Sequence, residues 1–132
     1  EEGVVYLLDQ HRVRQLAPDG TVTTLAGGAN ADYIDETGPA ARFDSPLGLA
    51  LDPYGNLVVA DTNNQRIRLI RFNEDDSTSV ILLAGLDEGP GYREGKMYQA
   101  RFNYPRGLAV GGDFLFVVDS KNNQIRRIDF YK

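Results

Sequence analysis

The chain repeats one long segment of its own sequence. Residues 41–70 read ARFDSPLGLALDPYGNLVVADTNNQRIRLI, and residues 100–128 read ARFNYPRGLAVGGDFLFVVDSKNNQIRRI. Phe43 recurs as Phe102, 59 residues later, and the offset falls to 58 after a turn that is one residue shorter. A more divergent copy opens the chain as GVVYLLDQHRVRQL. Sequence repeats of this size are typical of arrays of small supersecondary units.

Each repeat contains short apolar runs that are separated by turn residues. Gly, Pro, Asn and Asp between runs rich in Val, Ile and Leu favour an antiparallel meander. No segment sustains the apolar period of a helix over three turns. In the complete middle copy the runs are LGLAL (47–51), NLVVA (56–60), RIRLIRF (66–72) and SVILLAG (79–85).

These runs predict an all-β fold. The first two runs are nearly continuously apolar and the third alternates with arginine, as in a small sheet with a buried inner edge and a wetter outer edge. Such a sheet is typical of a β-propeller blade. The sequence therefore predicts ten antiparallel strands in three sheets, with only the middle sheet four-stranded and with residues 47–51 paired to residues 56–60.

The middle copy resembles an NHL repeat, whose pattern is P-x-G, three apolar residues, D-x-x-G-N, three apolar residues, then A-D-x-x-N-x-R-(apolar)-R. The third copy departs from this pattern where GGDFLF replaces the D-x-x-G-N turn and where Gln124 replaces the first Arg. The resemblance implies one partial propeller domain over residues 1–132, with blades at 3–27, 43–85 and 102–130. Since a closed propeller has about four to eight blades, we expect the C-terminal half of a roughly six-bladed ring, completed by the same longer chain.

Composition excludes several classes of function. The 14 basic and 19 acidic side chains give a net charge of −5 and form no basic tract, so we expect no nucleic-acid partner. No apolar run approaches the roughly 18 residues of a membrane-spanning helix. Cysteine is absent, which excludes disulfides and thiolate metal sites. We expect any targeting sequence to lie upstream of this segment.

Several recurring residues are interpreted as structural. Short polar side chains after the second run of each repeat are expected to cap the following turn by binding backbone N–H groups. The phenylalanines are expected to wedge between adjacent blades. The structural set is Asp61, Asn64, Arg68, Asp119, Asn122, Arg126, Phe43 and Phe102; the predicted core is Leu49, Leu57, Val59, Ile67, Leu108, Val117 and Ile125.

The connections between blades, residues 28–42 and 86–101, carry the candidate site. Tyr33 recurs as Tyr92, and Asp35 recurs as Glu94. In one interpretation the tyrosines are flat platforms, and the carboxylates accept sugar hydroxyls or cationic groups. In the other, the carboxylates accept backbone N–H groups of their own loops and the rings pack between blades. We expect the first loop to be structural and the second to project, and Asp87 and Glu88 add charge to the second.

Two further residues are open to more than one interpretation. Arg106 replaces Leu47 beside the inner strand, where it meets an anion or pairs with Glu94 or Asp87. His11, the only histidine, aligns with Gln65 before the outer strand, so its position in the repeat accounts for it.

The leading hypothesis is a non-catalytic module that binds a protein, peptide or carbohydrate. The alternative is a hydrolase or lyase whose active site lies in the propeller channel and comes largely from other blades. Neither a metal nor a cofactor is expected, and the resemblance to bacterial cell-envelope proteins implies an extracytoplasmic location. The proposed ligand-binding residues are Tyr92, Arg93, Glu94, Tyr98, Arg106, Tyr33 and Asp35.

Overall fold

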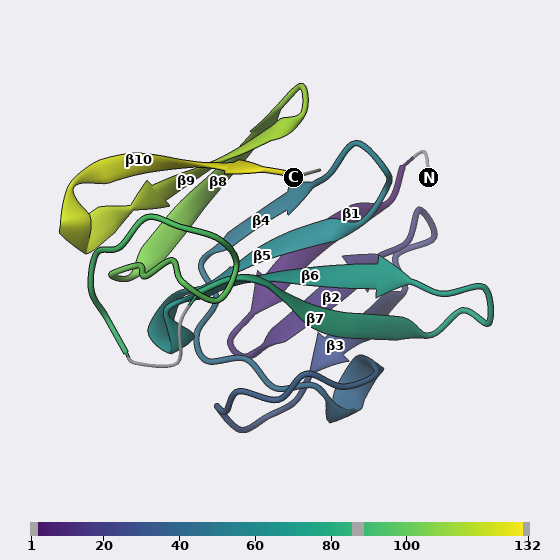
Figure 1. The fold of residues 1–132 in the computed structure, drawn as a ribbon. Helices are drawn as coiled ribbons and strands as arrows, with labels where there is room; N and C mark the ends of the chain where they lie inside the picture. Colours follow the sequence, from purple (N-terminus) through teal and green to yellow (C-terminus); the bar gives the residue numbers. More distant parts are fainter. Residues whose placement is uncertain (1–2, 86–88, 131–132) are drawn as a thin grey trace.

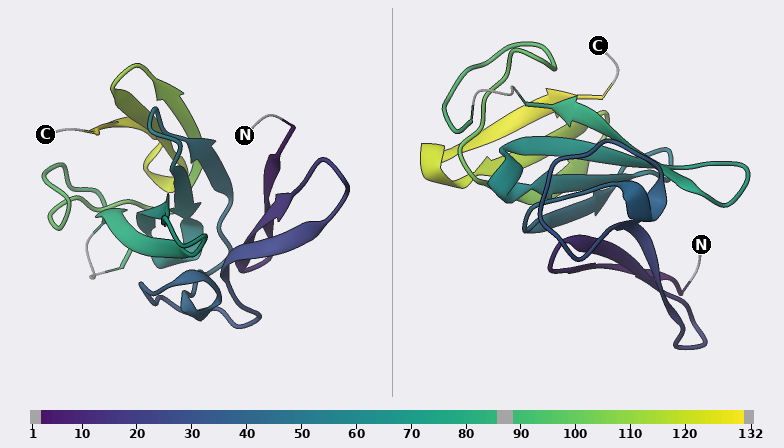
Figure 2. Two further views of the ribbon diagram at one scale, coloured as in Figure 1. Left: turned by 90° about the vertical axis from the view of Figure 1, so that its right-hand side faces the viewer. Right: turned by 90° about the horizontal axis from the view of Figure 1, so that it is seen from below.

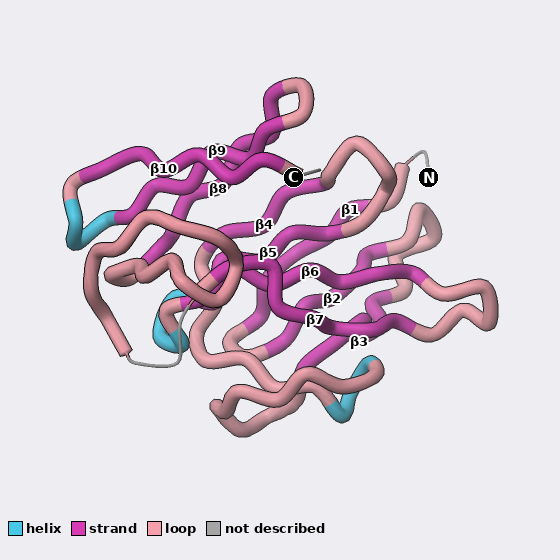
Figure 3. Tube along the Cα trace, in the orientation of Figure 1, coloured by secondary structure: helices cyan, strands magenta, loops and turns pink. Residues whose placement is uncertain are grey.

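Turn residues divide the chain into ten strands. The structure is a computed structural model and describes residues 3–85 and 89–130. Within these ranges the helical segments are single 3-10 turns, and long loops join the sheets (Figure 3). The elements are β1 (Val5–Asp9), β2 (Arg12–Leu16), β3 (Val22–Gly27), η1 (Gly38–Ala40), β4 (Gly48–Leu51), β5 (Leu57–Asp61), η2 (Thr62–Asn64), β6 (Arg66–Phe72), β7 (Thr78–Ala84), β8 (Pro105–Gly111), β9 (Phe114–Asp119), η3 (Ser120–Asn122) and β10 (Gln124–Asp129).

The strands form three antiparallel sheets that stand side by side like a fan (Figures 1 and 2). Blade 1 is β1-β2-β3, blade 2 is β4-β5-β6-β7 and blade 3 is β8-β9-β10. This confirms the all-β prediction of ten strands with only the middle sheet four-stranded. The predicted pairing of the first two strands of blade 2 is also confirmed, since Gly48 pairs with Ala60 and Leu51 with Leu57.

The core lies between the blades, in two apolar clusters. Alternate side chains of a strand point to opposite faces of its sheet, so Leu57 and Val59 of β5 face blade 1, while Val58 and Ala60 face blade 3. Each cluster contains one of the repeated phenylalanines. Phe43 (0% exposed) packs between blades 1 and 2, with Val13, Ala26 and Ile70; Phe102 (1% exposed) packs between blades 2 and 3, with Leu115 and Val117.

The predicted core was wrong at Ile125, which is 72% exposed. Its counterpart in blade 2, Ile67, is fully buried because blade 3 covers that face of the sheet. In the described part of the chain no further blade covers the corresponding face of blade 3. Leu49 and Leu108 are half-buried at the edges of the two clusters, and the other predicted core residues are buried.

The first strands of blades 2 and 3 approach each other very closely. A Cβ atom at Gly48 would lie 1.8 Å from the carbonyl oxygen of Arg106, so no larger residue fits there without movement of the backbone. The contact holds β4 beside β8 along the inner side of the fan.

The long connections between blades contact the 3-10 turns η2 and η3, which precede the third strand of blades 2 and 3. Loop 1 comprises residues 28–47, and the described part of loop 2 comprises residues 89–104. The Asn64 amide of η2 donates to the Asp32 carbonyl of loop 1 at 2.8 Å, and the Asn122 amide of η3 donates to the Gly91 carbonyl of loop 2 at 2.9 Å. Each loop is therefore fastened to the blade that follows it.

Candidate functional site

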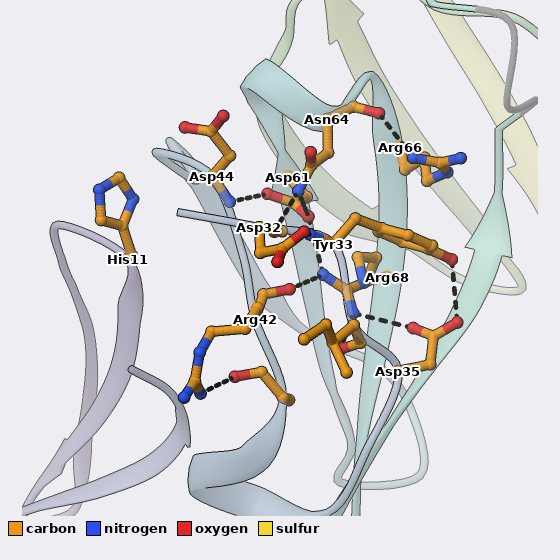
Figure 4. Close-up of polar contacts among 12 residues, drawn as sticks. His11, Asp32, Tyr33, Asp35, Arg42, Asp44, Asp61, Asn64, Arg66 and Arg68 are labelled. Carbon is orange, nitrogen blue, oxygen red and sulfur yellow. Dashed lines mark hydrogen bonds and ion pairs between the residues drawn. The ribbon is translucent and has the colours of Figure 1, made fainter. Parts of the chain in front are cut away.

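One buried guanidinium organises loop 1. The side chain of Arg68 is fully buried, and it donates to Asp61 at 2.8 Å and to the carbonyl of Arg42 through Nη1 (Figure 4). Through Nη2 it donates to the carbonyl of Ile34 at 2.7 Å and to Asp35 at 2.8 Å. The side chain thereby joins β5, β6 and both arms of loop 1.

Asp61 is the main anionic partner of this guanidinium. Its Oδ1 accepts the backbone N–H of Asp44 at 2.8 Å, and its Oδ2 also accepts the Asn64 amide at 2.8 Å. The prediction that Asp61 caps its own turn was wrong, because the carboxylate faces loop 1 and Arg68 instead. Burial raises the pKa of Asp61, and Arg68, the Asn64 amide and the Asp44 N–H oppose that rise.

Blade 3 repeats this arrangement around Arg126. Arg126 Nη1 donates to Asp119 at 2.7 Å and to the Arg101 carbonyl at 2.8 Å, and Nη2 donates to the Arg93 carbonyl at 2.7 Å. Asp119 is fully buried and also faces its loop rather than capping its own turn. The repeated Asp and Arg residues therefore hold loops 1 and 2 in the same way.

Tyr33 and Asp35 differ from both interpretations of the sequence. The Tyr33 hydroxyl donates to Asp35 Oδ2 at 2.9 Å, so Asp35 accepts from a hydroxyl and a guanidinium and not from a backbone N–H of its loop. The half-buried ring lies between two arginines, with the guanidinium carbons of Arg66 and Arg68 at 3.8 and 4.5 Å from its centre (Figure 4). Loop 1 thus uses Tyr33 within its own framework.

Burial, followed by the hydrogen bond to Asp35, raises the pKa of Tyr33 to about 12 from an ordinary value of 10.0. Because the folded-state pKa lies above the unfolded one, the stability contributed by neutral Tyr33 is fully present below pH 10 and is lost as the pH rises through about 12. In an ultraviolet titration we expect Tyr33→Phe to remove the component that ionises last, with circular dichroism verifying the fold at each pH. Loss of a component that ionises near pH 10 would contradict this assignment.

Loop 2 presents two tyrosines and a methionine to solvent, while Phe102 of the same loop is buried. Tyr92 is 46% exposed and Tyr98 is 67% exposed, and Met97 between them is 40% exposed. The Tyr92 hydroxyl donates to Glu94 Oε1 at 2.8 Å, and this hydrogen bond raises the pKa of Tyr92. Loop 2 therefore places an aromatic ring, a carboxylate and a thioether on one exposed segment.

The remaining described candidates are Arg93, within loop 2, and Arg106, on β8. Arg93 is exposed, and its backbone pairs with Arg101. Arg106 is exposed on β8, and within the described ranges no ion pair joins it to Glu94. Asp87 and Glu88 lie outside the described residues.

A second set of hydrogen bonds links neighbouring blades, and it was not predicted from the sequence. The ring Nδ1 of His11 in blade 1 accepts the backbone N–H of Ser45 at 3.0 Å, and Gln65 Oε1 of blade 2 accepts that of Tyr104 at 2.6 Å. Ser45 and Tyr104 both have a positive φ, 49° and 56°, so each marks the same bend ahead of an inner strand. The shared position of His11 and Gln65 in the repeat was the available signal, and it indicates a positional role for the histidine.

Two hollows accompany these features. One of about 630 Å³ lies between loop 2 and β10, and one of about 610 Å³ lies beside His11, Ser45 and Leu47. Within residues 3–85 and 89–130, no three His, Asp or Glu side chains are grouped closely enough to hold a metal ion. None of the helical turns described here has the length and apolar character needed to cross a membrane.

Comparison with known proteins gives a consistent picture. The NHL repeat model matches residues 43–68 and 102–128. Protein SUPPRESSOR OF QUENCHING 1, chloroplastic, of Arabidopsis thaliana is 38% identical over 62% of this chain and 8% of its own length. NHL repeat-containing protein 2 of Homo sapiens is 31% identical over 84% of this chain and 16% of its own length.

Among solved structures, a Bacteroides thetaiotaomicron protein of unknown function superposes with a TM-score of 0.83 at 25% identity, over 94% of this chain and 32% of that one. The chain thus spans less than a fifth of these two curated relatives and about a third of this solved structure. The matched segments begin at Phe43 and Phe102; the first covers β4, β5 and the start of β6, and the second covers nearly all of blade 3. The chain therefore contains two NHL repeats and has the fold of part of an NHL-type β-propeller.

Proposed function

We propose that this chain is a non-catalytic binding module that contacts a protein or peptide through loop 2. The observation that carries the proposal is the contrast between the two loops. Loop 1 encloses its tyrosine between two arginines, whereas loop 2 leaves Tyr92, Met97 and Tyr98 exposed beside a hollow of about 630 Å³. Tyrosine and methionine are enriched at protein interfaces, where each offers a large contact area.

We also propose that further blades of the same longer chain pack against blade 3. Phe116, Val118 and Ile125 are 37, 46 and 72% exposed on the outer face of this sheet. The corresponding face of blade 2 is fully buried by blade 3. The extracytoplasmic location remains a proposal, and the repeat's resemblance to bacterial envelope proteins supports it.

The alternative of a hydrolase or lyase centre in the channel would draw on the inner strands. The described inner strands, β4 and β8, carry glycine, alanine, leucine, valine, proline and one ionisable side chain, Arg106. The acid–base groups of such a centre would therefore come from other blades. This favours the binding module as the function of the present residues.

Panning a peptide-display library against the full chain tests the proposal. We expect selected peptides to bind Tyr92→Ala/Arg93→Ala at least about tenfold more weakly than the wild type, a loss of about 1.4 kcal/mol. Tyr54→Ala, which removes an exposed ring (63%, against 46% for Tyr92) from the β4–β5 turn, is the matched control and should leave affinity unchanged. Selected peptides that bind the double variant at wild-type strength would remove loop 2 as the site, and a glycan array would identify a carbohydrate ligand instead.

A further inference from the structure

Four side chains, those of Arg66, Tyr33, Arg68 and Phe43, form a stack in the middle copy of the repeat and the loop that precedes it. The guanidinium carbons of Arg66 and Arg68 lie 3.8 and 4.5 Å from the centre of the Tyr33 ring (Figure 4). The guanidinium carbon of Arg68 also lies 4.6 Å from the centre of the Phe43 ring. Arg66 also donates to the carbonyl of Asn64 at 3.3 Å. The outer face of Tyr33 is therefore covered by a cation that belongs to the same blade.

The third copy of the repeat, together with loop 2, has the same stack without a counterpart of Arg66. The guanidinium of Arg126 lies 4.6 Å from the centre of the Tyr92 ring and 4.8 Å from that of Phe102. Gln124 occupies the position of Arg66 in the repeat. Among the described residues, no second guanidinium therefore lies over the Tyr92 ring as Arg66 lies over Tyr33. Tyr92 is accordingly 46% exposed.

The carboxylate beside this ring is also used differently. Asp35 receives both the Tyr33 hydroxyl and Arg68 Nη2, but Arg126 Nη2 binds the Arg93 carbonyl and forms no ion pair with Glu94 in the described part of the chain. The contact that Glu94 makes is with the neutral Tyr92 hydroxyl at 2.8 Å. Its negative charge therefore remains next to the exposed ring.

A hollow adjoins Glu94. The cavity of about 630 Å³ is lined by Glu94, Gln124 and Arg126 and by the apolar side chains of Leu83, Met97 and Ile128. Three further charged residues line it: Arg127, Asp129 and Lys96. Arg127 and Asp129 form an ion pair at 3.2 Å and Arg126 is paired with Asp119 at 2.7 Å, so within the described residues Lys96 is the lining cation without an ion pair.

We infer that the outer face of Tyr92, together with Glu94, is a binding site for an arginine side chain of a partner protein. The inference rests on the proposed function of loop 2 and names the chemistry that it recognises. The guanidinium stacks on Tyr92 as Arg66 stacks on Tyr33, and it donates to Glu94 and to the carbonyl of Asn122, the counterpart of Asn64. An aromatic face attracts a cation, and a weakly hydrated, planar guanidinium is the cation that stacks best.

The test uses a pentapeptide, acetyl-Gly-Gly-Arg-Gly-Gly-amide, and the same peptide with neutral citrulline or with lysine in place of arginine. In nuclear magnetic resonance titrations of the full chain, we expect the arginine peptide to shift the Tyr92 and Glu94 signals. The citrulline peptide should bind about two- to fivefold more weakly, the size of one exposed cation–π contact. Gln124→Arg supplies the missing arginine from within the blade, so it should weaken binding of the arginine peptide by a similar factor, as should Glu94→Gln.

Equal binding of the arginine and citrulline peptides, tighter binding of the lysine peptide, or unchanged binding to Gln124→Arg and Glu94→Gln would each overturn the inference. Failure of the inference can be distinguished from failure of the proposed function. Library peptides that lack arginine but depend on Tyr92 and Arg93 would overturn the arginine site and leave the binding module in place. Library peptides whose binding does not depend on Tyr92 and Arg93 would overturn both the arginine site and the proposed function of loop 2.

Discussion

Replacing Arg68 with methionine is expected to lower the free energy of unfolding by about 3–5 kcal/mol. Methionine fills much of the same space, but it leaves the fully buried carboxylate of Asp61 without its cation. The carbonyls of Ile34 and Arg42 lose their guanidinium donor and keep only each other's backbone N–H. Removing one partner of a buried ion pair is costly because the remaining charge stays desolvated. Urea unfolding followed by circular dichroism measures the loss.

Arg14→Met is the matched control. Arg14 also bonds an aspartate, Asp9, at 3.0 Å, but these side chains are 29% and 44% exposed, so we expect a loss of about 0–1 kcal/mol. Adding Asp61→Leu to Arg68→Met should recover part of the stability, because the orphaned charge is then gone. A loss below about 1 kcal/mol for Arg68→Met alone would mean that Arg68 is not the centre of a buried network.

Truncating Phe43 to alanine is expected to cost about 3–5 kcal/mol, the usual range for deleting a buried aromatic ring. The ring is fully buried between blades 1 and 2, and Arg68 lies over its face, so the cavity cannot close without moving one blade toward the other. Phe72→Ala removes a ring that is 39% exposed and should cost less than half as much. Equal losses in the two variants, again from urea unfolding, would show that Phe43 is not a wedge between blades.

The fold could be predicted from the sequence because the strands and turns of each blade recur at regular intervals along the chain. Turn residues at fixed positions and apolar runs of strand length predicted ten strands, three sheets and the pairing of β4 with β5. Phe43 and Phe102 were recognisable because each recurs ahead of an inner strand. The error at Ile125 has a simple physical origin: a side chain's alternation tells which face it joins, but burial also requires a neighbouring blade to cover that face.

The candidate site was less predictable because hydrogen-bond partners depend on distance in three dimensions. Arg68 was recognised as part of the repeat, but its reach to the carbonyls of loop 1 leaves no mark on the pattern. Asp61 was expected to bind the N–H groups of its own turn and Asp35 those of its own loop; both meet this guanidinium, and the N–H that Asp61 accepts comes from Asp44 in loop 1. Only the replacement of Arg66 by Gln124 was visible in advance, and it is the substitution that leaves Tyr92 open.

The direction in which each arginine reaches has a consequence for how such genes grow by duplication. Arg68 bonds Ile34 and Asp35, and β7 also depends on loop 1, because the Val80 N–H donates to the carbonyl of Glu36 at 3.0 Å. A copied segment that began at Phe43 would encode a complete sheet but would bury an arginine without three of its four acceptors. A copy that began ahead of Tyr33 would carry every group that its arginine needs. The segment that must be duplicated as a unit therefore begins in the loop ahead of the sheet and not at the sheet itself. A duplication with this boundary adds a blade that brings all the acceptors of its buried arginine.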